Sequence, residues 1–248
     1  MHTLLSHHKI RKERKLLGAE ILPLQMGTSK AFLIINGANS ILVDAGNKNK
    51  EDKVFEAMDR FLLPPESLRL IVITHTHFDH CGSLRRIQKR TGAKILVHSE
   101  EARYLRNGYS PIPKGTFFLS RWISYLGQKL FPGIAAFPKV KPDIIIQEKY
   151  DLEKFGLRAY ILPTPGHTAG SCSLIIEDKY AIVGDTLFGM FPPSVYPPFA
   201  NNQEEMIRSW KLLLDSGCRR FLPAHGSPIS REELLEAYGK YQGQIPIE

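Results

Sequence analysis

Short apolar segments separated by turn residues recur along the chain, and their length and β-branched content predict strands. In the first half the predicted strands are 31–35, 41–43, 70–74 and 93–97. Helical spacing of apolar residues appears between them, at 50–63, at 83–90 and after Ser99, which is expected to cap its helix. One face of the 50–63 helix is apolar and consists of Val54, Phe55, Met58, Phe61 and Leu62.

The second half begins again with strands, predicted at 157–162, 173–177 and 180–183 and followed by a helix over 203–215. A last strand over 219–222 and a helix over 231–241 complete the pattern. Two β-rich halves with interspersed helices predict two packed sheets covered by helices, which is a layered α/β sandwich. No sequence repeat relates the two halves.

The interval 108–142 departs from this pattern of strands and helices, because proline, glycine and aromatic residues surround one predicted helix over 116–130. One face of that helix is apolar and consists of Phe118, Trp122, Tyr125, Leu126 and Leu130. Residues 102–142 hold seven basic side chains and no acidic one. We interpret the interval as an insertion whose apolar face packs on the body of the protein or on a second subunit. A substrate lid and a membrane-surface contact are the alternatives.

Composition is typical of a globular protein, since 43% of the 248 residues are apolar and 23% are charged. We expect a single domain over 19–248, preceded by a basic N-terminal extension, 1–18, that supplies about half of the formal charge of +8. Such basic runs are more often solvated tails than binding sites. No apolar run reaches the roughly 18 residues that span a bilayer. The three cysteines form no disulfide pattern, so we expect a cytoplasmic location.

Three imidazoles and one carboxylate crowd into the stretch 75–80, directly after a predicted strand. These candidate ligands are His75, His77, Asp79 and His80. Neutral imidazole nitrogen and carboxylate oxygen bind borderline cations such as zinc well. Four such groups cannot all point at one ion, whereas two adjacent ions would use them all. Further ligands must then come from distant segments.

Three candidates for these further ligands each follow a predicted strand, in turns rich in glycine and proline: His167, Asp185 and His225. Small flanking residues allow the backbones to crowd around a compact site. Two other side chains with reactive groups are interpreted as structural. We interpret His98 as a structural residue and Cys81 as a buried thiol.

In order and spacing, these seven residues are similar to the signature of the metallo-β-lactamase superfamily, a His-x-His-x-Asp-His stretch followed by a His, an Asp and a final His. The resemblance covers roughly residues 20–230. It implies a four-layer αβ/βα sandwich with a dinuclear site at one edge. The ligands that it implies for the first metal are His75, His77 and His167. For the second metal they are Asp79, His80 and His225, with Asp185 bridging both ions.

Two divalent ions in such a site would lower the pKa of a shared water towards roughly 7 and polarise the oxygen of the bond under attack. The metal-bridging hydroxide is then the nucleophile, and no protein nucleophile is required. Asp79 is the expected general base, since one of its oxygens can bind metal while the other orients the hydroxide or takes a proton. Zinc (Zn2+) is the expected metal, with iron or manganese as alternatives.

The predicted enzyme is a metal-dependent hydrolase that cleaves a small ester, thioester or lactone. True β-lactamases lack the bridging carboxylate that Asp185 would supply, whereas the sequence from Gly184 to Phe188 resembles the thioesterase branch that includes glyoxalase II. The chain ends too soon after His225 for the helical C-terminal domain with which glyoxalase II holds glutathione. The gap from Asp185 to His225 is likewise too short for the large insertion of β-CASP nucleases.

Three other functions stay open on the sequence: a phosphodiesterase or nuclease of the same superfamily, a mononuclear iron dioxygenase acting on persulfides, and a non-catalytic metal-binding protein. The expected partner is a small molecule with an anionic group, which suits the basic insertion, and an apolar portion. Nucleic acid is not favoured, no transmembrane segment is predicted, and an oligomer through 108–142 is left open. Tyr196, Asn201 and Asn202 are candidates for additional oxyanion stabilisation.

Overall fold

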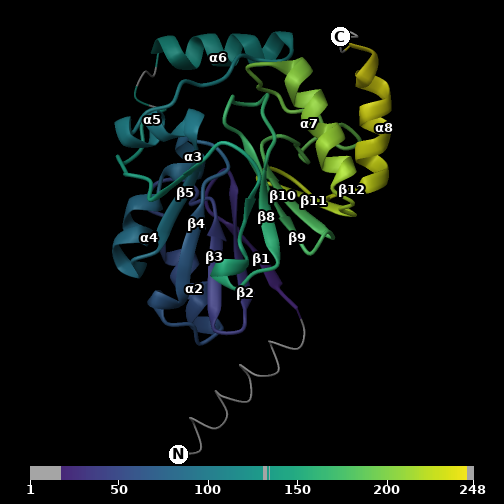
Figure 1. The fold of residues 1–248 in the computed structure, drawn as a ribbon. Coiled ribbons are helices and arrows are strands. Elements are labelled where there is room, and N and C mark those ends of the chain that lie inside the picture. Colours follow the sequence, from purple (N-terminus) through teal and green to yellow (C-terminus); the bar gives the residue numbers. More distant parts are fainter. Residues whose placement is uncertain (1–17, 131–132, 134, 245–248) are drawn as a thin grey trace, which may run out of the picture.

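The structure is a computed structural model that describes residues 18–130, 133 and 135–244. The predicted basic extension 1–18 therefore lies, except for Gly18, outside the described residues. Two six-stranded mixed sheets pack face to face, and helices cover both outer faces (Figure 1). The four-layer αβ/βα sandwich is thus confirmed. In the described part of the chain, no helix has the length and apolar character needed to cross a bilayer.

The first sheet contains the strands of the first half. Its order is β1 (Glu20–Gln25), β2 (Lys30–Asn36), β3 (Asn39–Val43), β4 (Leu68–Val72), β5 (Lys94–His98) and β6 (Ile144–Ile146). The pairs β1–β2 and β2–β3 are antiparallel, and the strands from β3 to β6 are parallel. The helices α2 (Asp52–Arg60), α4 (Leu84–Thr91) and α5 (Ser99–Asn107) cover its outer face, while the short α3 (Phe78–Cys81) follows β4.

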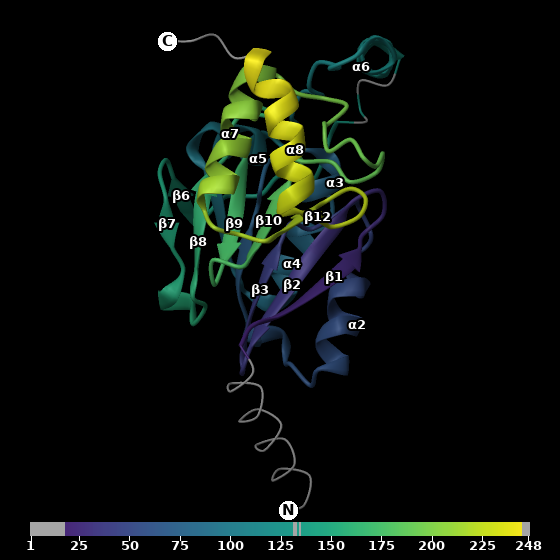
Figure 2. The same cartoon turned by 90° about the vertical axis from the view of Figure 1, so that its right-hand side faces the viewer.

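The second sheet contains the strands of the second half. Its order is β12 (Ile229–Ser230), β11 (Arg220–Pro223), β10 (Tyr180–Gly184), β9 (Cys172–Ile176), β8 (Ala159–Pro163) and β7 (Tyr150–Asp151). Only the pair β10–β11 is parallel among these strands. Its outer face carries α7 (Gln203–Asp215) and α8 (Arg231–Tyr241), as Figure 2 shows. Short 3-10 helices occur at Pro65–Ser67, Glu153–Phe155 and Gln242–Gln244.

Three apolar clusters hold the four layers together, one between each pair of neighbouring layers. In β2 the side chains of Leu33 and Ile35 belong to the cluster under the first-half helices, whereas Phe32 and Ile34 belong to the cluster between the sheets. Both faces of this strand are therefore buried. That burial explains why its sequence is a continuous apolar run rather than an alternating one.

Several predicted elements differ from the observed ones at their ends. The 50–63 helix ends at Arg60, and Leu62, predicted on its buried face, is exposed with a positive φ of 53°. Ser99 does not cap α5, because the ring of His98 accepts the backbone N–H of Glu100 instead. The strand β1 was not predicted, because its Pro23 interrupts the apolar strand pattern. Proline is tolerated there because β1 lies at the edge of the sheet.

The predicted helix of the insertion is present as α6 (Phe118–Leu130), which begins two residues later than expected. Its apolar face does not pack on the body of the protein, so the packing interpretation is wrong for a single chain. The exposed residues of that face are Phe118, Trp122, Tyr125 and Leu126. The side chain of Leu130, also predicted on this face, lies outside the described side chains.

Candidate metal centre

The seven predicted ligands come together where strands of both sheets end. The 75–80 stretch follows β4 of the first sheet, and His167 follows β8 of the second. Asp185 comes directly after β10, and His225 comes after β11. A hydrogen bond from the backbone N–H of Cys172 to the carbonyl of Thr74 ties the two sheets together at this point. Carboxyl ends of neighbouring parallel strands meet at one edge, which is the usual position of a functional site in such sheets.

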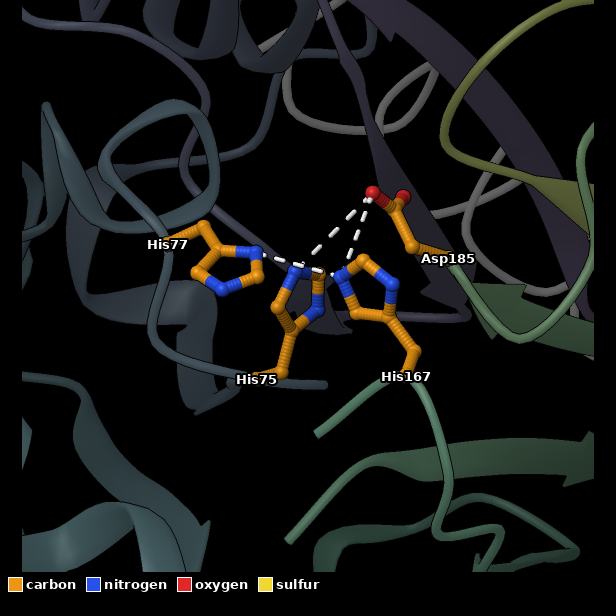
Figure 3. A group of neighbouring side chains, drawn as sticks. All are labelled: His75, His77, His167 and Asp185. Carbon is orange, nitrogen blue, oxygen red and sulfur yellow. Dashed lines mark hydrogen bonds and ion pairs between the residues drawn. The ribbon is translucent and has the colours of Figure 1, made fainter. Parts of the chain in front are cut away.

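Three imidazoles, those of His75, His77 and His167, form what we call the first half-site. Nε2 of His167 lies 3.1 Å from Nδ1 of His77. The Oδ2 atom of Asp185 faces this group, at 3.7 Å from Nε2 of His167 and 4.0 Å from Nε2 of His75 (Figure 3). One atom from each of the four residues lies within 4.8 Å of the others, which is the arrangement that a single cation requires.

The second half-site consists of Asp79, His80 and His225. Nε2 of His225 lies 3.4 Å from Oδ2 of Asp79, and Nε2 of His80 lies 4.0 Å from Oδ1 of the same carboxylate. The Oδ1 atom of Asp185 faces this group, at 3.4 Å from Nε2 of His80 and 3.5 Å from Nε2 of His225. Asp185 therefore directs one oxygen to each half-site.

Four buried polar atoms of the ligand residues lack hydrogen-bond partners among the described residues: Nε2 of His75, His77 and His80, and Oδ1 of Asp185. Burying a polar atom without a partner costs free energy, and proteins rarely tolerate it without a functional reason. Imidazole nitrogens and carboxylate oxygens are also the donor set that zinc takes. The residues present therefore fit a pair of divalent cations.

Asp44, at the end of β3, holds the second half-site from behind. Its carboxylate accepts hydrogen bonds from the backbone N–H of Thr74 at 2.9 Å and from Nδ1–H of His80 at 2.8 Å. The second bond leaves Nε2 of His80 directed at the centre. Asp44 is fully buried and has a positive φ of 61°, so its backbone is held in a conformation that few side chains adopt.

Glu101, in the first turn of α5, supports the loop that carries the first half-site. Its buried carboxylate accepts the backbone N–H of Thr76 at 2.9 Å and also the hydroxyl of Thr76. In the same half-site Nδ1–H of His167 donates to the carbonyl of Phe199 at 2.8 Å. Sequence reasoning missed Asp44 and Glu101. The sequence signal for Asp44 was its position at a strand end, followed by Ala-Gly. The signal for Glu101 was its position in a helix that begins where a strand ends.

Gly184 permits the close approach of the end of β10 to the turn that follows β4. Its φ is +51°, and a Cβ built there would lie 2.6 Å from Oγ1 of Thr74. Gly166 makes a similar contact beside His167, with a φ of +128° and only 2.3 Å between a Cβ and the backbone nitrogen of Met206. A larger residue at either position would push a ligand-bearing turn away from the centre.

The imidazoles of the first half-site are held neutral. Burial and the neighbouring imidazoles lower the pKa of His75 well below its ordinary value. Burial, together with His167, lowers the pKa of His77 to about 3. Burial also lowers the pKa of His167. A neutral imidazole presents a lone pair, so these three rings are ready to bind a cation without losing a proton.

The imidazoles of the second half-site hold their protons more strongly. Burial lowers the pKa of His80, but the charges of Asp44 and Asp185 outweigh it and raise the pKa well above the ordinary value. Burial is likewise outweighed at His225, where Asp185 and Asp79 raise the pKa. In turn, burial would raise the pKa of Asp79, but the hydrogen bond from His225 and the charge of His80 lower it to about 2.

The three residues considered for oxyanion stabilisation make structural contacts. The side chain of Asn202 caps α7 by accepting the backbone N–H of Glu205, and the hydroxyl of Tyr196 donates to the side chain of Gln203. The backbone N–H of Asn201 donates to the carbonyl of His167 and so supports that ligand's turn. Cys81 is fully buried, and burial raises the pKa of its thiol well above the ordinary value, so a thiolate role is disfavoured.

Comparisons with known proteins show which family and which proteins this chain is similar to. The family model described as the metallo-beta-lactamase superfamily matches residues 25–225. A probable metallo-hydrolase of Methanocaldococcus jannaschii is 33% identical over 65% of this chain and 68% of its own length. The acyl-coenzyme A thioesterase MBLAC2 of Gallus gallus is 25% identical over 87% and 79%. The crystal structure of an archaeal metallo-beta-lactamase superfamily protein from Sulfolobus tokodaii superposes with a TM-score of 0.66 at 22% identity, covering 93% of this chain and 88% of that one.

Proposed function

This chain belongs to the metallo-β-lactamase superfamily, and we propose that it is a hydrolase with a dinuclear metal centre that cleaves a small ester, thioester or lactone. The observation that carries the proposal is the position of Asp185. Its two oxygens face two separate groups of ligands, at 3.7 Å from His167 and 3.4 Å from His80. A carboxylate so placed suits two cations rather than one.

When bound, two divalent cations such as zinc would acidify water and polarise the carbonyl oxygen of the substrate. The first half-site would hold one cation and the second half-site the other. Asp79 is ionised at neutral pH, and the hydroxyl of Thr28 donates to its Oδ2 at 3.2 Å and fixes its orientation. We infer that Asp79 accepts a hydrogen bond from the attacking water and takes its proton. Because its pKa is about 2, orienting the water is the larger part of this role.

Aromatic side chains beside the second half-site support an acyl substrate. The ring of Phe188 stacks on His225 with 5.0 Å between centroids, and it also stacks on Phe191 at 6.1 Å. Phe191 lines a groove of about 550 Å³ together with Phe117 and Leu119. An acyl chain could run along these rings while its carbonyl carbon stays at the metal centre. The name of the chicken relative, an acyl-coenzyme A thioesterase, agrees with this bond class.

The test is a metal count followed by a substrate screen. Zinc-loaded protein should contain two metal ions per chain and should hydrolyse acyl thioesters, lactones or aryl esters. Asp79→Asn should abolish most of this activity, whereas Asp59→Asn, the same change at an exposed position on α2, should not. Hydrolysis of bis-p-nitrophenyl phosphate alone would point to a nuclease instead. One iron per chain would favour oxygen chemistry, and inertness towards every substrate would favour a binding protein.

A further inference from the structure

The apolar face of α6 is turned away from the rest of the protein. Five apolar side chains there expose between 42% and 77% of their surface: Phe118, Leu119, Trp122, Tyr125 and Leu126. The helix directs serines to the body instead. Ser120 and Ser124 are buried, and the hydroxyl of Ser124 donates to the carbonyl of Pro113 at 2.9 Å. This orientation is the reverse of that of an ordinary surface helix, so the face is suited to a contact outside the chain.

The charges around the apolar face of α6 indicate which kind of partner it binds. Lys129 lies at the C-terminal end of the face, with its ammonium 5.7 Å from the centre of the Tyr125 ring. Arg121, on the same helix, and Lys114, which precedes it, are also exposed. Together they line a groove that contains one acidic residue, Glu204. Residues 102–142 contain no acidic side chain. Two copies of the face would bring like charges together, whereas an anionic lipid surface would attract them. Tryptophan and tyrosine are also the side chains that settle at a lipid–water boundary.

We propose that α6 docks this protein onto an anionic membrane surface. Figure 2 shows α6 standing out from the body at the end of the molecule opposite α2. Phe117 and Leu119 line one groove with Phe191. The ring of Phe191 stacks on that of Phe188, which in turn stacks on His225 of the second half-site. Docking through α6 would therefore bring the groove lined by Phe117, Leu119 and Phe191 to the lipid surface. The proposal concerns binding alone and does not depend on the hydrolase activity.

The experiment uses the full chain and vesicles of phosphatidylcholine containing about one-third phosphatidylglycerol, compared with pure phosphatidylcholine. We expect cosedimentation with the mixed vesicles that weakens at high salt. Trp122→Ser should lower the partition coefficient by about tenfold. Lys129→Glu should weaken binding to the mixed vesicles only. The matched control is Leu62→Ser beyond the end of α2, where the leucine is 52% exposed against 50% for Trp122. That variant should bind as the wild type does.

Fluorescence supplies an independent readout of the same contact. The chain has two tryptophans, Trp122 and the fully buried Trp210, so a blue shift on adding vesicles reports on Trp122. Trp122→Phe should bind without that shift. The Trp122→Ser variant retains the basic N-terminal residues, so binding equal to that of the wild type would assign adhesion to them and overturn the proposal. Absence of vesicle binding would overturn it too, as would a dimer in light scattering that Trp122→Ser dissociates.

Discussion

The two half-sites of the metal centre lie side by side and share Asp185, yet they differ in charge. Burial is the main cause that lowers the pKa of all three imidazoles in the first half-site. In the second half-site burial acts in the same direction, but nearby carboxylates outweigh it and raise the pKa of His80 and His225. Before any cation binds, the first half-site is therefore neutral, whereas the second tends to carry protons.

This difference indicates an order of loading. A cation entering the first half-site displaces no proton, whereas one entering the second must displace protons from His80 and His225. The second half-site also contains Asp79, the residue that we propose to orient water. In our proposal, the half-site that takes its ion less readily is therefore the one that orients the water. Four experiments test whether the two half-sites are as distinct as their charges indicate.

Asp185→Ala should have the largest effect, because it removes the carboxylate that both half-sites share. We expect hydrolysis to fall by about 10⁴-fold and bound metal to fall below two ions per chain. Elemental analysis and steady-state kinetics measure the two outcomes, and circular dichroism checks that the fold is retained. Unchanged metal stoichiometry would remove Asp185 from the proposed bridge.

Asp79→Asn should act on the second half-site alone. Its amide retains the shape of the carboxylate but not its charge, so we expect activity to fall by about 10²- to 10³-fold while the first half-site keeps its ion. Rates at saturating substrate, compared with those of the Asp59→Asn control, measure the effect. A fully active variant would exclude Asp79 from catalysis.

Asp44→Asn and Glu101→Gln form a matched pair, because each replaces a buried carboxylate behind a different half-site. Loss of such a supporting hydrogen bond lowers metal affinity or activity by about 10- to 100-fold. Asp44→Asn should weaken the second half-site, and Glu101→Gln should weaken the first. Titration against a chromophoric chelator separates the two affinities. If both variants weakened the same ion, the proposed division of ligands would be wrong.

Mild acidification should produce the smallest effect. The pKa values of His80 and His225 are raised, so as pH falls these rings bind protons before those of the first half-site do. Because two protons must be displaced, we expect affinity at the second half-site to drop by about tenfold for each half pH unit below neutrality, with a smaller change at the first. Metal content after dialysis at stepped pH measures this. Simultaneous loss of both ions would contradict the proposed difference in proton affinity between the two half-sites.

Most long elements of the fold could be predicted from sequence because burial on one or both faces leaves a periodic apolar pattern. The helix α7 has its predicted bounds, Gln203–Asp215, and α8 has its predicted bounds, Arg231–Tyr241. The strands β6, β7 and β12 contain two or three residues each, too few for any period to be visible. The end of α2 was misplaced because Leu62 continues the apolar spacing although the chain has already left the helix.

The candidate site was predicted more completely than the fold around it. Imidazoles and carboxylates at strand ends stand out in sequence, and the structure brings all seven together in the two predicted groups. Their role as ligands stays a prediction. Asp44 and Glu101 were missed because their importance comes from hydrogen bonds to Thr74, His80 and Thr76, which only the folded chain places beside them.

By itself the sequence determined the candidate metal ligands and the layered fold, because residue types and their local spacing indicate both. Only the tertiary structure decided how charge divides between the half-sites, since a pKa depends on which carboxylates and how much burial surround each imidazole. It also decided which way α6 faces. An amphipathic period predicts that a helix has an apolar face, but contacts such as that of Ser124 with Pro113 determine whether the face points inward or outward.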